Sequence, residues 1–487
     1  MPVDPPLRSL PTSHLLIGDR RITDASGGEY QHVYAATNRP TVTVTLGGPR
    51  EIDEAVGAAR AAFPAWRALP PGERRRLLLA LGDQILRHAD RLAQIQTIEN
   101  GVPCRFATDL PPLAADYFAY NAGWADKIGG AVHPVWPGPA FDYSLDEPYG
   151  VVGLIVPWNA PLASLGQLLG PALAAGNTIV VKPPELTPFT AICVGELALD
   201  AGFPPGVINV VPGGPAAGEA LVRHANVDKI HFTGSDRTAR HVLAAALDHI
   251  TPVSLELGGK SALLIFADAD LLRAAEQAVS AAIVLSGQGC TNSTRVLVDA
   301  AIYDRIVSVA KGLLKRVRVG DPLDDATLMG PVISQAACER ILTRIGDART
   351  RHEGRLVIGG ERLGGPLADG FFISPALFAD VDNASPLAQD EIFGPVVSFM
   401  KFETEEEALA LANASRYGLA AYVHTSDVRR AHRVARALAA GAVWVNGFDG
   451  VTPSAPFGGV KASGYGRLGG RHGIREFTRT KNVWVSL

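Results

Sequence analysis

The first part of the chain shows the spacing of amphipathic helices. Within residues 74–99, apolar side chains recur at helical intervals between charged residues, at Leu77, Leu81, Ile85, Leu92 and Ile95. Intervals of about three or four residues place side chains on one face of an α-helix. We therefore predict that residues 51–101 are largely helical.

The pattern changes beyond residue 149, where short apolar runs alternate with helical stretches. Runs that fit buried strands occupy residues 150–157, 178–182, 207–211 and 229–233, and helical patterns occupy residues 162–175, 188–201 and 217–224. This alternation predicts βαβ units and a mostly parallel sheet. Because strand–helix units resume after Ser261, we predict an α/β fold of two α/β domains with parallel-rich sheets.

Residues 125–147 follow neither pattern. They are rich in Gly and Pro with scattered aromatic residues, a composition typical of an extended arm or hairpin. Since such a segment cannot bury its own apolar side chains, we predict a small β arm that lies against another domain or another subunit.

Composition narrows the possible partners. The 487 residues carry 45 basic and 49 acidic side chains, giving a net charge of −4. Since neither sign predominates, we expect no nucleic-acid partner and no membrane partner. The apolar runs are far shorter than the ~20 residues that span a bilayer. The N-terminal residues lack the pattern of a secretory signal, so we expect a cytoplasmic protein.

The cysteines are few and far apart, without a CxxC pair: Cys104, Cys193, Cys290 and Cys338. We therefore expect neither a disulfide framework nor a metal site. A reducing compartment would leave a thiol free to act as a nucleophile.

Cys290 is the candidate nucleophile because small residues, Gly289 and Thr291, flank it. A planar carbonyl can approach a thiolate in such a position. Attack on an aldehyde gives a thiohemiacetal, which can lose a hydride to an oxidised nicotinamide. The alternative is a buried, inert cysteine that serves only in packing.

Two further residues give Cys290 a chemical context. Glu256 stands at a predicted strand end before paired glycines, where its carboxylate could take the thiol proton or activate water. Asn159 follows another predicted strand, and its amide could donate to a developing oxyanion. Taken singly, a surface salt-bridging glutamate and a turn-forming asparagine are the alternatives.

The chain lacks the common glycine pattern of dinucleotide-binding domains, because no predicted strand leads into GxGxxG. Other short motifs follow one another along nearly the whole chain, at residues 156–159 (VPWN), 182–185 (KPPE), 232–235 (FTGS), 256–260 (ELGGK), 287–290 (GQGC), 391–395 (EIFGP), 456–461 (PFGGVK) and 463–467 (SGYGR). Together they resemble the NAD(P)-dependent, hydrolytic branch of the aldehyde dehydrogenase superfamily.

The resemblance implies NAD-dependent oxidation of an aldehyde to a carboxylic acid. Cys290 is then the nucleophile, Glu256 the general base, and Asn159 the oxyanion donor alongside the Cys290 amide. It also implies that the cofactor is held by Trp158, Lys182, Glu185, Gly234, Ser235, Glu391 and Phe393.

Several of these cofactor roles also have a physical reason. A carboxylate at Glu185 can accept from both ribose hydroxyls but would repel a 2′-phosphate, which favours NAD over NADP. Ser235 follows Gly234 at a predicted strand-to-helix turn, where backbone N–H groups favour the pyrophosphate. Glu391 and Phe393 are expected to position the nicotinamide ribose and ring, although Phe393 could instead be a packing residue.

The substrate pocket implied by the resemblance is lined by Ala160, Ser164, Gln167, Gly289, Thr291, Val451 and Phe457. Small residues leave volume, and the serine and glutamine add polar groups. We therefore expect bulky or partly polar aldehydes to be preferred over acetaldehyde.

Two leucines depart from the family pattern. Many relatives carry a lysine and a glutamate, thought to relay protons from the base, where this chain has Leu168 and Leu468. Losing both together suggests that an apolar contact replaces a polar one, because losing only one would leave a buried charge. Glu256 would then exchange protons directly with water or through backbone groups.

The resemblance also implies how the chain is divided. We expect a nucleotide-binding domain over residues 1–126 and 148–255, a catalytic domain over residues 256–470, and an oligomerisation arm over residues 127–147 and 471–487. In the family this arm completes a partner subunit's sheet, so a homodimer or homotetramer is expected.

Two other functions are compatible with this fold. A coenzyme A-acylating semialdehyde dehydrogenase has the same fold but lacks a base at the position of Glu256. A non-catalytic binding protein with this fold would predict erosion of Cys290, Glu256 or Asn159, and all three are present.

Overall fold

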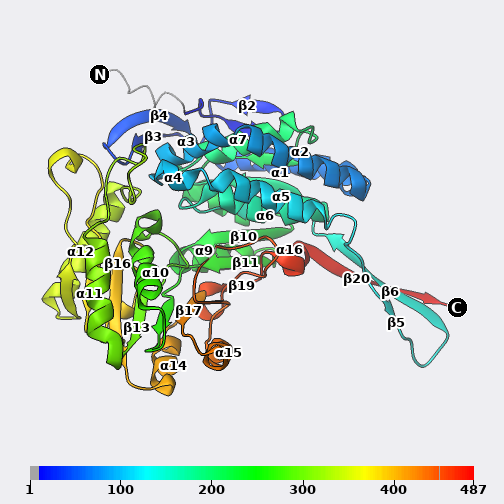
Figure 1. Ribbon diagram of the computed structural model, residues 1–487. Helices are drawn as coiled ribbons and strands as arrows, with labels where there is room; N and C mark the ends of the chain where they lie inside the picture. The colour runs from blue at the N-terminus through cyan, green and yellow to red at the C-terminus, as the bar shows by residue number, and fades with distance from the viewer. Residues whose placement is uncertain (1–9, 449) are drawn as a thin grey trace.

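The computed structural model describes residues 10–448 and 450–487. Within these residues the chain forms an eight-stranded and a seven-stranded sheet, a three-stranded arm and a two-stranded hairpin. The hairpin consists of β3 (Glu29–Tyr34) and β4 (Arg39–Thr45). Figure 1 shows the larger sheets side by side, each flanked by helices. In this part of the chain, no helix is both long enough and apolar enough to cross a membrane.

The N-terminal half begins with the helices that the hydrophobic spacing predicts. They are α1 (Pro49–Ala68), α2 (Pro71–Arg87) and α3 (Ala89–Asn100). Helix α3 ends at Gly101, whose φ of 79° fits the left-handed conformation that glycine adopts readily. Two helices that the sequence did not predict follow, α4 (Cys104–Ala107) and α5 (Leu110–Ala122).

The first large sheet has the order β19-β11-β10-β7-β8-β9-β1-β2. Its parallel centre consists of β7 (Val151–Ile155), β8 (Thr178–Lys182), β9 (Ile208–Val210), β10 (Lys229–Gly234) and β11 (Val253–Leu257). The connecting helices are α6 (Pro161–Ala175), α7 (Phe189–Asp200), α8 (Pro215–Val222) and α9 (Asp236–Ala246). The predicted strand–helix alternation is confirmed throughout this region.

The edges of the first sheet come from distant parts of the chain. On one side, β1 (Leu15–Ile17) pairs antiparallel with β9 and carries β2 (Arg20–Ile22). On the other side, β19 (Gly464–Tyr465) pairs antiparallel with β11. A C-terminal segment therefore completes the sheet next to Glu256.

The second large sheet confirms the predicted second α/β unit. Its order is β14-β15-β16-β13-β12-β17-β18, with only β14 antiparallel to its neighbour. The strands are β12 (Ala262–Ile265), β13 (Arg295–Asp299), β14 (Arg355–Ile358), β15 (Ala376–Ala379), β16 (Val396–Phe402), β17 (Ala420–His424) and β18 (Ala442–Val445). Helices α10 (Leu271–Ile283), α11 (Tyr303–Leu314), α12 (Gln335–Thr350), α13 (Pro386–Gln389), α14 (Glu405–Asn413) and α15 (Val428–Ala437) accompany it.

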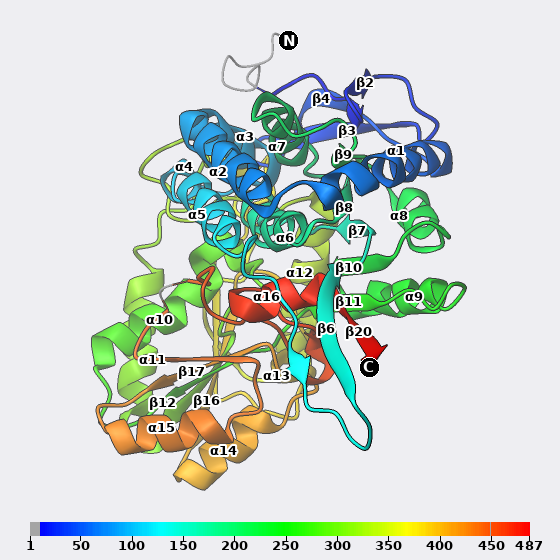
Figure 2. The same ribbon diagram turned by 90° about the vertical axis from the view of Figure 1, so that its right-hand side faces the viewer.

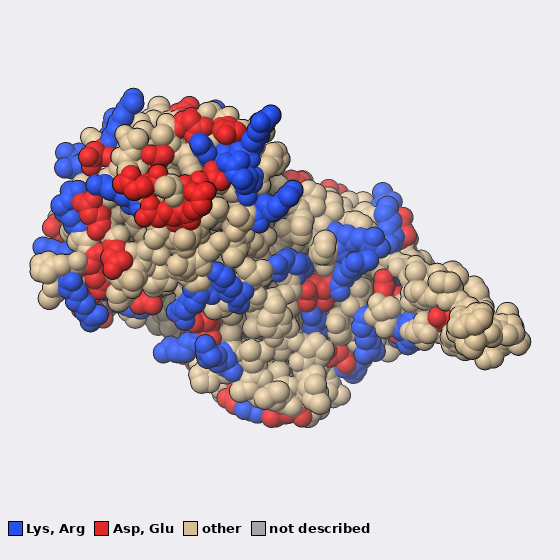
Figure 3. All heavy atoms as spheres, turned by 90° about the horizontal axis from the view of Figure 1, so that it is seen from below, with Lys and Arg blue, Asp and Glu red and all other residues tan. Residues whose placement is uncertain are grey.

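The predicted arm is a projecting β structure. Strand β6 (Ala140–Pro148) pairs antiparallel with β5 (Val132–His133) and with the C-terminal β20 (Thr478–Ser486). Figure 2 shows β6 and β20 side by side, and Figure 1 shows that they project from the main body. The end of the arm is mostly uncharged (Figure 3), and exposed apolar side chains along it include Val132, Trp136, Phe141, Trp484 and Leu487.

Each large sheet has its own hydrophobic cores. One pair of apolar clusters packs on the first sheet and its helices, and another pair packs on the second. The first sheet also takes up β19, which lies outside the range expected for the nucleotide-binding domain. The domain boundaries stay a prediction.

Candidate active site

The candidate site lies where the carboxyl edge of the first sheet meets loops that lead into the second sheet. Chain order reverses around β7, which has β8 on one side and β10 on the other. In open parallel sheets, ligands bind in the crevice at such a switch point. Asn159, Lys182, Ser235 and Glu256 all stand at or just beyond carboxyl strand ends.

Cys290 lies on a strained segment before β13. Three consecutive residues, Leu285, Ser286 and Gly287, have φ values of 52°, 54° and 75°. Each non-glycine residue in this left-handed region costs about 1–2 kcal/mol. A Cβ at Gly287 would lie 2.1 Å from the Gly394 carbonyl oxygen, so only glycine allows this close packing against the 391–395 motif.

Side-chain hydrogen bonds hold the segment in this conformation. The Ser286 hydroxyl donates to the Gly330 carbonyl at 2.9 Å. The Gln288 side chain accepts from the Ile333 amide at 3.0 Å and donates to the Leu285 carbonyl at 3.0 Å. These contacts offset the backbone strain and fix the approach to Cys290.

Cys290 is a free cysteine whose residue as a whole is partly exposed, whereas Cys193 and Cys338 are buried. Burial raises the pKa of the Cys290 thiol to about 12, with further increases from the carboxylates of Glu391 and Glu256. In the absence of ligands, this cysteine is therefore a neutral thiol that needs a base. The partial exposure argues against a residue that serves only in packing.

Asn159 links the two sheets at this point. Its Nδ2 donates to the Gln288 carbonyl at 2.9 Å, two positions before Cys290. Its own backbone carbonyl accepts from Nδ2 of the Asn100 side chain at 3.0 Å. One amide hydrogen thus orients the side chain beside the cysteine loop, and the second can donate to a substrate oxygen.

Glu256 is buried rather than paired on the surface, with 6% of its area exposed. Its Oε2 atom has no hydrogen-bond partner within the described residues. A Cβ at Gly458 would lie 2.8 Å from Glu256 Oε1 and 3.1 Å from Arg467 Nη1, so the guanidinium is close by. Burial raises the pKa of Glu256 well above its ordinary value, Arg467 lowers it and Glu476 raises it.

The predicted ribose contacts lie together at the end of β8. Lys182 is buried, and its Nζ donates to the Gly213 carbonyl at 2.6 Å. Burial lowers the pKa of Lys182 to about 8, against an opposing effect of Glu185. Glu185 is half-buried, so its carboxylate remains accessible to a ligand.

The predicted pyrophosphate contact has the geometry expected for it. Strand β10 ends at Gly234, and Ser235 caps helix α9 by accepting from the Thr238 amide at 3.2 Å. The Ser235 side chain is exposed. The N-terminus of this helix offers backbone N–H groups and a favourable dipole to an anion.

Glu391 lies against the glycines that follow Glu256. It accepts from the Gly259 amide at 3.0 Å, and a Cβ at Gly258 would lie 1.9 Å from its Oε2. Burial raises the pKa of Glu391 to about 7, while the Gly259 N–H and Lys260 lower it. The carboxyl group is thus held between the motif that carries the base and the cysteine loop.

Phe393 combines a strained backbone conformation with an aromatic contact. Its φ is 53°, which is rare for a bulky residue, and its ring meets the Trp158 ring edge-on at 5.3 Å. Backbone strain of this kind persists only where the surroundings fix it. These groups fit a nicotinamide dinucleotide, because the helix N-terminus can donate to a phosphate, the carboxylates can accept from ribose hydroxyls and the aromatic pair can pack against a ring.

The predicted pocket residues come from three parts of the chain. Ala160, Ser164 and Gln167 are half-buried at the start of α6, on one face of that helix. Val451 is tied to α5, because the Tyr117 hydroxyl donates to its carbonyl at 3.2 Å. Phe457 is buried, while Gly289 and Thr291 flank Cys290.

Tyr422 is a site residue that sequence reasoning missed. Its hydroxyl donates to the Thr291 carbonyl at 2.8 Å, directly after Cys290. Its ring stacks on Trp444 at 5.3 Å, and Phe448 meets both rings edge-on. No sequence signal marks Tyr422, because it lies inside an apolar strand and only the sheet order brings it to Thr291.

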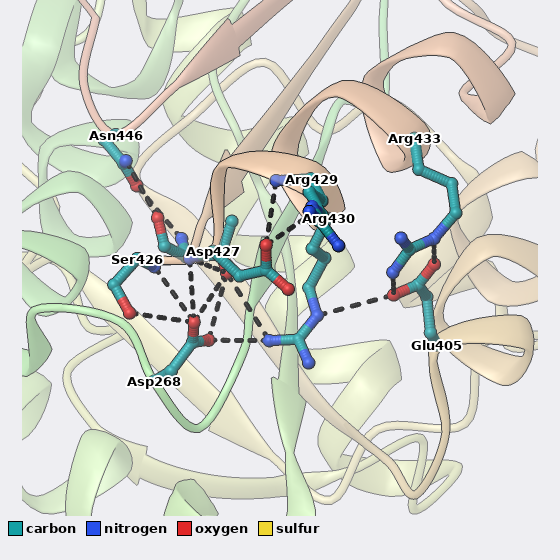
Figure 4. Close-up of polar contacts among 9 residues, drawn as sticks. Asp268, Glu405, Ser426, Asp427, Arg429, Arg430, Arg433 and Asn446 are labelled. Atoms are coloured by element: carbon teal, nitrogen blue, oxygen red, sulfur yellow. Dashed lines mark hydrogen bonds and ion pairs between the residues drawn. The ribbon is translucent and has the colours of Figure 1, made fainter.

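A polar network anchors the end of β18 from which the pocket loop departs. Asn446 accepts from the Thr425 amide at 3.0 Å and donates to its carbonyl at 2.9 Å. Asp268 in turn accepts from Thr425, Ser426 and Arg430 (Figure 4). The loop that carries Val451 and Phe457 therefore starts from a fixed point.

The two leucines that depart from the family pattern lie in a single apolar core. Leu168 and Leu468 are both buried, and both belong to the cluster around α5 and α6. Leu468 also pairs with Phe457 through two backbone hydrogen bonds of 2.7 Å. The expectation that apolar packing occupies these positions is confirmed.

Comparisons with known proteins agree with this geometry. The model of the aldehyde dehydrogenase family matches residues 22–483. Betaine aldehyde dehydrogenase of Cereibacter sphaeroides is 40% identical over 483 residues, 99% of each chain. Human mitochondrial aldehyde dehydrogenase is 42% identical over 463 residues, 93% of this chain and 88% of that protein. The crystal structure of PnpE from Pseudomonas sp. WBC-3 with nicotinamide adenine dinucleotide is similar at a TM-score of 0.95 and 40% identity, covering 98% of both chains.

Proposed function

The chain belongs to the aldehyde dehydrogenase family, and from this premise we propose that Cys290, Glu256 and Asn159 carry out its reaction. Members of this class use NAD(P)⁺ and a cysteine to oxidise an aldehyde to a carboxylic acid, and the fold is theirs. The observation that supports the proposed roles best is the bond from Asn159 Nδ2 to the Gln288 carbonyl. It brings the oxyanion donor of one sheet to the nucleophile loop of the other.

In the first half of the proposed cycle, Glu256 takes the proton of the Cys290 thiol. The thiolate sulfur then bonds to the aldehyde carbon, and the carbonyl oxygen becomes an oxyanion. The second N–H of Asn159 and the Cys290 amide stabilise this charge, and one such donor contributes about 2.7–4 kcal/mol to the transition state. When bound, NAD supplies the acceptor for the hydride that leaves this carbon.

In the second half, Glu256 acts on water. Loss of the hydride leaves a thioester, and Glu256 first releases the thiol proton so that it is again a carboxylate. It then takes a proton from a water molecule that attacks the thioester carbon. The carbon–sulfur bond breaks to release the carboxylic acid and the Cys290 thiolate, which takes the proton back from Glu256. The partnerless Oε2 supports this role, because a base must be free to accept a proton. A coenzyme A-acylating enzyme would need no such base.

The first test is NADH formation with NAD and a graded panel of short, long, branched and aromatic aldehydes. We expect turnover that falls by about 10⁴-fold or more in Cys290→Ala. Cys338→Ala is a matched control, because that cysteine is buried in the core of the second sheet and should leave turnover unchanged. Turnover only on adding coenzyme A would favour the acylating enzyme, and NAD binding without any turnover would favour a binding protein.

We further propose a preference for bulky or partly polar aldehydes. The half-buried Ser164 and Gln167 side chains on α6 support it, since they offer polar groups beside small residues. A kcat/KM that is highest for acetaldehyde across the panel would contradict it.

We propose NAD over NADP as the preferred cofactor. Glu185 supports this preference because its carboxylate would repel a 2′-phosphate. In Glu185→Gln, the ratio of kcat/KM for NADP to that for NAD should rise by about tenfold, the equivalent of ~1.4 kcal/mol. Glu219→Gln, an exposed position on α8, is the control. An unchanged ratio would mean that Glu185 does not set the preference for NAD over NADP.

Finally, we propose a cytoplasmic homodimer or homotetramer assembled through the arm. Trp136 and Trp484 support assembly, since both are strongly exposed on β structure that projects from the body. Light scattering of the intact chain and of Trp136→Ser/Trp484→Ser tests it, because a monomer in both would contradict it.

A further inference from the structure

The two strands that lead to Glu256 have one apolar and one polar face. Ile230 and Phe232 of β10, with Leu255 and Leu257 of β11, belong to the apolar core beneath α8 and α9. Side chains alternate along a strand, so the intervening residues share the opposite face. These residues are Lys229, His231 and Thr233 on β10, and Ser254 and Glu256 on β11.

Strand register brings these polar side chains into one row. Thr233 is paired with Glu256, and His231 with Ser254. Adjacent strands lie about 4.8 Å apart, so Thr233 and Glu256 are cross-strand neighbours on this face, with Glu256 Oε2 still free of a hydrogen-bond partner within the described residues. On its other side His231 is paired with Leu154 of β7, an apolar residue that offers no further polar contact.

His231 connects the row through both ring nitrogens. Nε2 lies 3.0 Å from Thr233 Oγ1, and Nδ1 lies 3.0 Å from Ser254 Oγ. The side chain is buried, with 1% of its area exposed. A neutral imidazole has one donor and one acceptor nitrogen, so it can receive a proton on one side and release one on the other.

The far end of the row reaches a carboxylate at the surface. Glu476 ends helix α16 (Gly470–Glu476). A Cβ at Gly466 would lie 2.9 Å from Glu476 Oε2 and 3.0 Å from Ser254 Cβ, so both side chains approach Gly466. Lys229 Nζ binds Glu476 Oε1 at 2.8 Å.

Glu476 opens onto solvent. It lines a hollow of about 390 Å³ together with Tyr149, Gly466, Arg467, His472 and Arg475. Since Gly466 also lines this hollow, the hollow extends to the residue that Ser254 and Glu476 both approach.

We propose that His231 relays the proton of Glu256, by way of Thr233 and Ser254, to Glu476 and the solvent-filled hollow. This inference rests on the proposed role of Glu256 as the base. The protonated carboxyl group gives its proton to Thr233 Oγ1, whose hydroxyl proton moves to His231 Nε2. The Nδ1 proton passes to Ser254 Oγ, and the Ser254 proton passes to Glu476 or to water. Glu256 is again a carboxylate, and one proton has left the site.

The charges around the row suit this transfer. Burial lowers the pKa of His231 to about 3, and the positive charge of Lys229 lowers it further. The ring therefore stays neutral between transfers and does not trap a proton. Lys229 also holds Glu476 in place, and Arg467 donates its backbone N–H to Glu476 Oε2 at 3.0 Å.

The test separates acid release from hydride transfer in rapid-mixing experiments on the full-length enzyme with NAD and its best aldehyde. In His231→Gln, the amide can keep both hydrogen bonds but cannot exchange protons between two nitrogens. We expect the NADH burst to change less than about twofold, while release of the carboxylic acid slows by about tenfold or more. The solvent deuterium isotope effect on acid release should rise.

His424→Gln is the matched control, because His424 is also a buried histidine in a parallel strand but lies in the second sheet. It should leave both phases unchanged. Thr233→Val is a second test variant that keeps the shape of a half-exposed side chain but removes one link of the row. It should slow acid release as His231→Gln does.

Three outcomes would overturn the relay. These are unchanged acid release in His231→Gln and Thr233→Val, equal losses in both phases, or an equal effect of His424→Gln. Glu256→Gln distinguishes a failure of the proposed base from a failure of the relay. If it leaves acid release unchanged, the proposed base is wrong; if it slows acid release while the His231 and Thr233 variants do not, only the relay is wrong.

Discussion

The nucleophile and the base of this site are held in opposite ways. Residues 285–292 combine left-handed backbone conformations with hydrogen bonds from Ser286, Gln288 and Tyr422. Glu256 stands on a regular strand and has an oxygen without a partner. The cysteine loop is thus over-determined, whereas the carboxyl group of the base is left free.

This difference follows from what each residue must do in the proposed mechanism. A sulfur that attacks a carbonyl needs a fixed position, since small displacements of reacting groups cost much of the rate. A base that serves two steps must bind and release protons, and a hydrogen bond to its charged form would lower its pKa and its basicity. Rigidity at Cys290 and freedom at Glu256 are therefore complementary.

Among the variants that test this comparison, the largest effect is expected at Asn159, which joins the cysteine loop to the first sheet. Asn159→Ala removes the proposed oxyanion donor together with the bond to the Gln288 carbonyl. We expect kcat to fall by about 10²–10³-fold, measured with saturating NAD and aldehyde. Asn383→Ala, a substitution in the turn between β15 and α13, should leave kcat within a few fold. A loss below tenfold in Asn159→Ala would mean that the loop positions the oxyanion without this amide.

The next prediction concerns the ionisation of the two regions in the free enzyme. Because the pKa of Cys290 is raised to about 12, the thiol is neutral near pH 7 and its thiolate fraction grows with pH. Alkylation by iodoacetamide should accelerate about 100-fold from about pH 7 to pH 9. Glu391→Gln removes a charge that raises this pKa, so alkylation at fixed pH should be faster than in the unmodified enzyme. A rate independent of pH would show that the free enzyme holds a thiolate.

A third prediction tests the rigidity of the cysteine loop itself. Gly287→Ala places a Cβ against the Gly394 carbonyl at a positive φ, and should lower the free energy of unfolding by about 2 kcal/mol. Activity should fall with it because the loop must shift. The control is Gly312→Ala in α11, where nothing lies within 4 Å of the added Cβ; it should be neutral or stabilising in the same urea titration. Equal stability of the two variants would contradict a tightly packed loop.

The smallest expected effect comes from Tyr422. Tyr422→Phe keeps the ring stack on Trp444 but removes the hydrogen bond to the Thr291 carbonyl, a loss of about 1 kcal/mol. We expect kcat/KM to fall roughly fivefold with little change in thermal stability. Tyr303→Phe removes a comparable buried hydroxyl at the start of α11, which donates to the Phe399 carbonyl, and should affect stability rather than kcat/KM. The reverse pattern would place Tyr422 among the residues that only support the fold.

Local sequence determined much of this protein. Helical spacing, apolar runs and the Gly- and Pro-rich segment were sufficient to predict α1 to α3, the strands β7 to β10 and the arm, because each pattern reflects burial along a single element. The motifs likewise predicted which residues stand at strand ends. Helix α5 was missed because it is apolar on most sides, as expected of a helix packed between α2 and α6.

Only the tertiary structure decided which of these residues meet. Strand order placed Tyr422 beside Thr291, and strand register aligned His231 and Ser254 with Thr233 and Glu256. The burial of Glu256 likewise depends on elements far away in the chain, such as β19. Period and composition report the burial of a residue along its own element, whereas contacts between strands depend on the order in which distant segments assemble into the sheet.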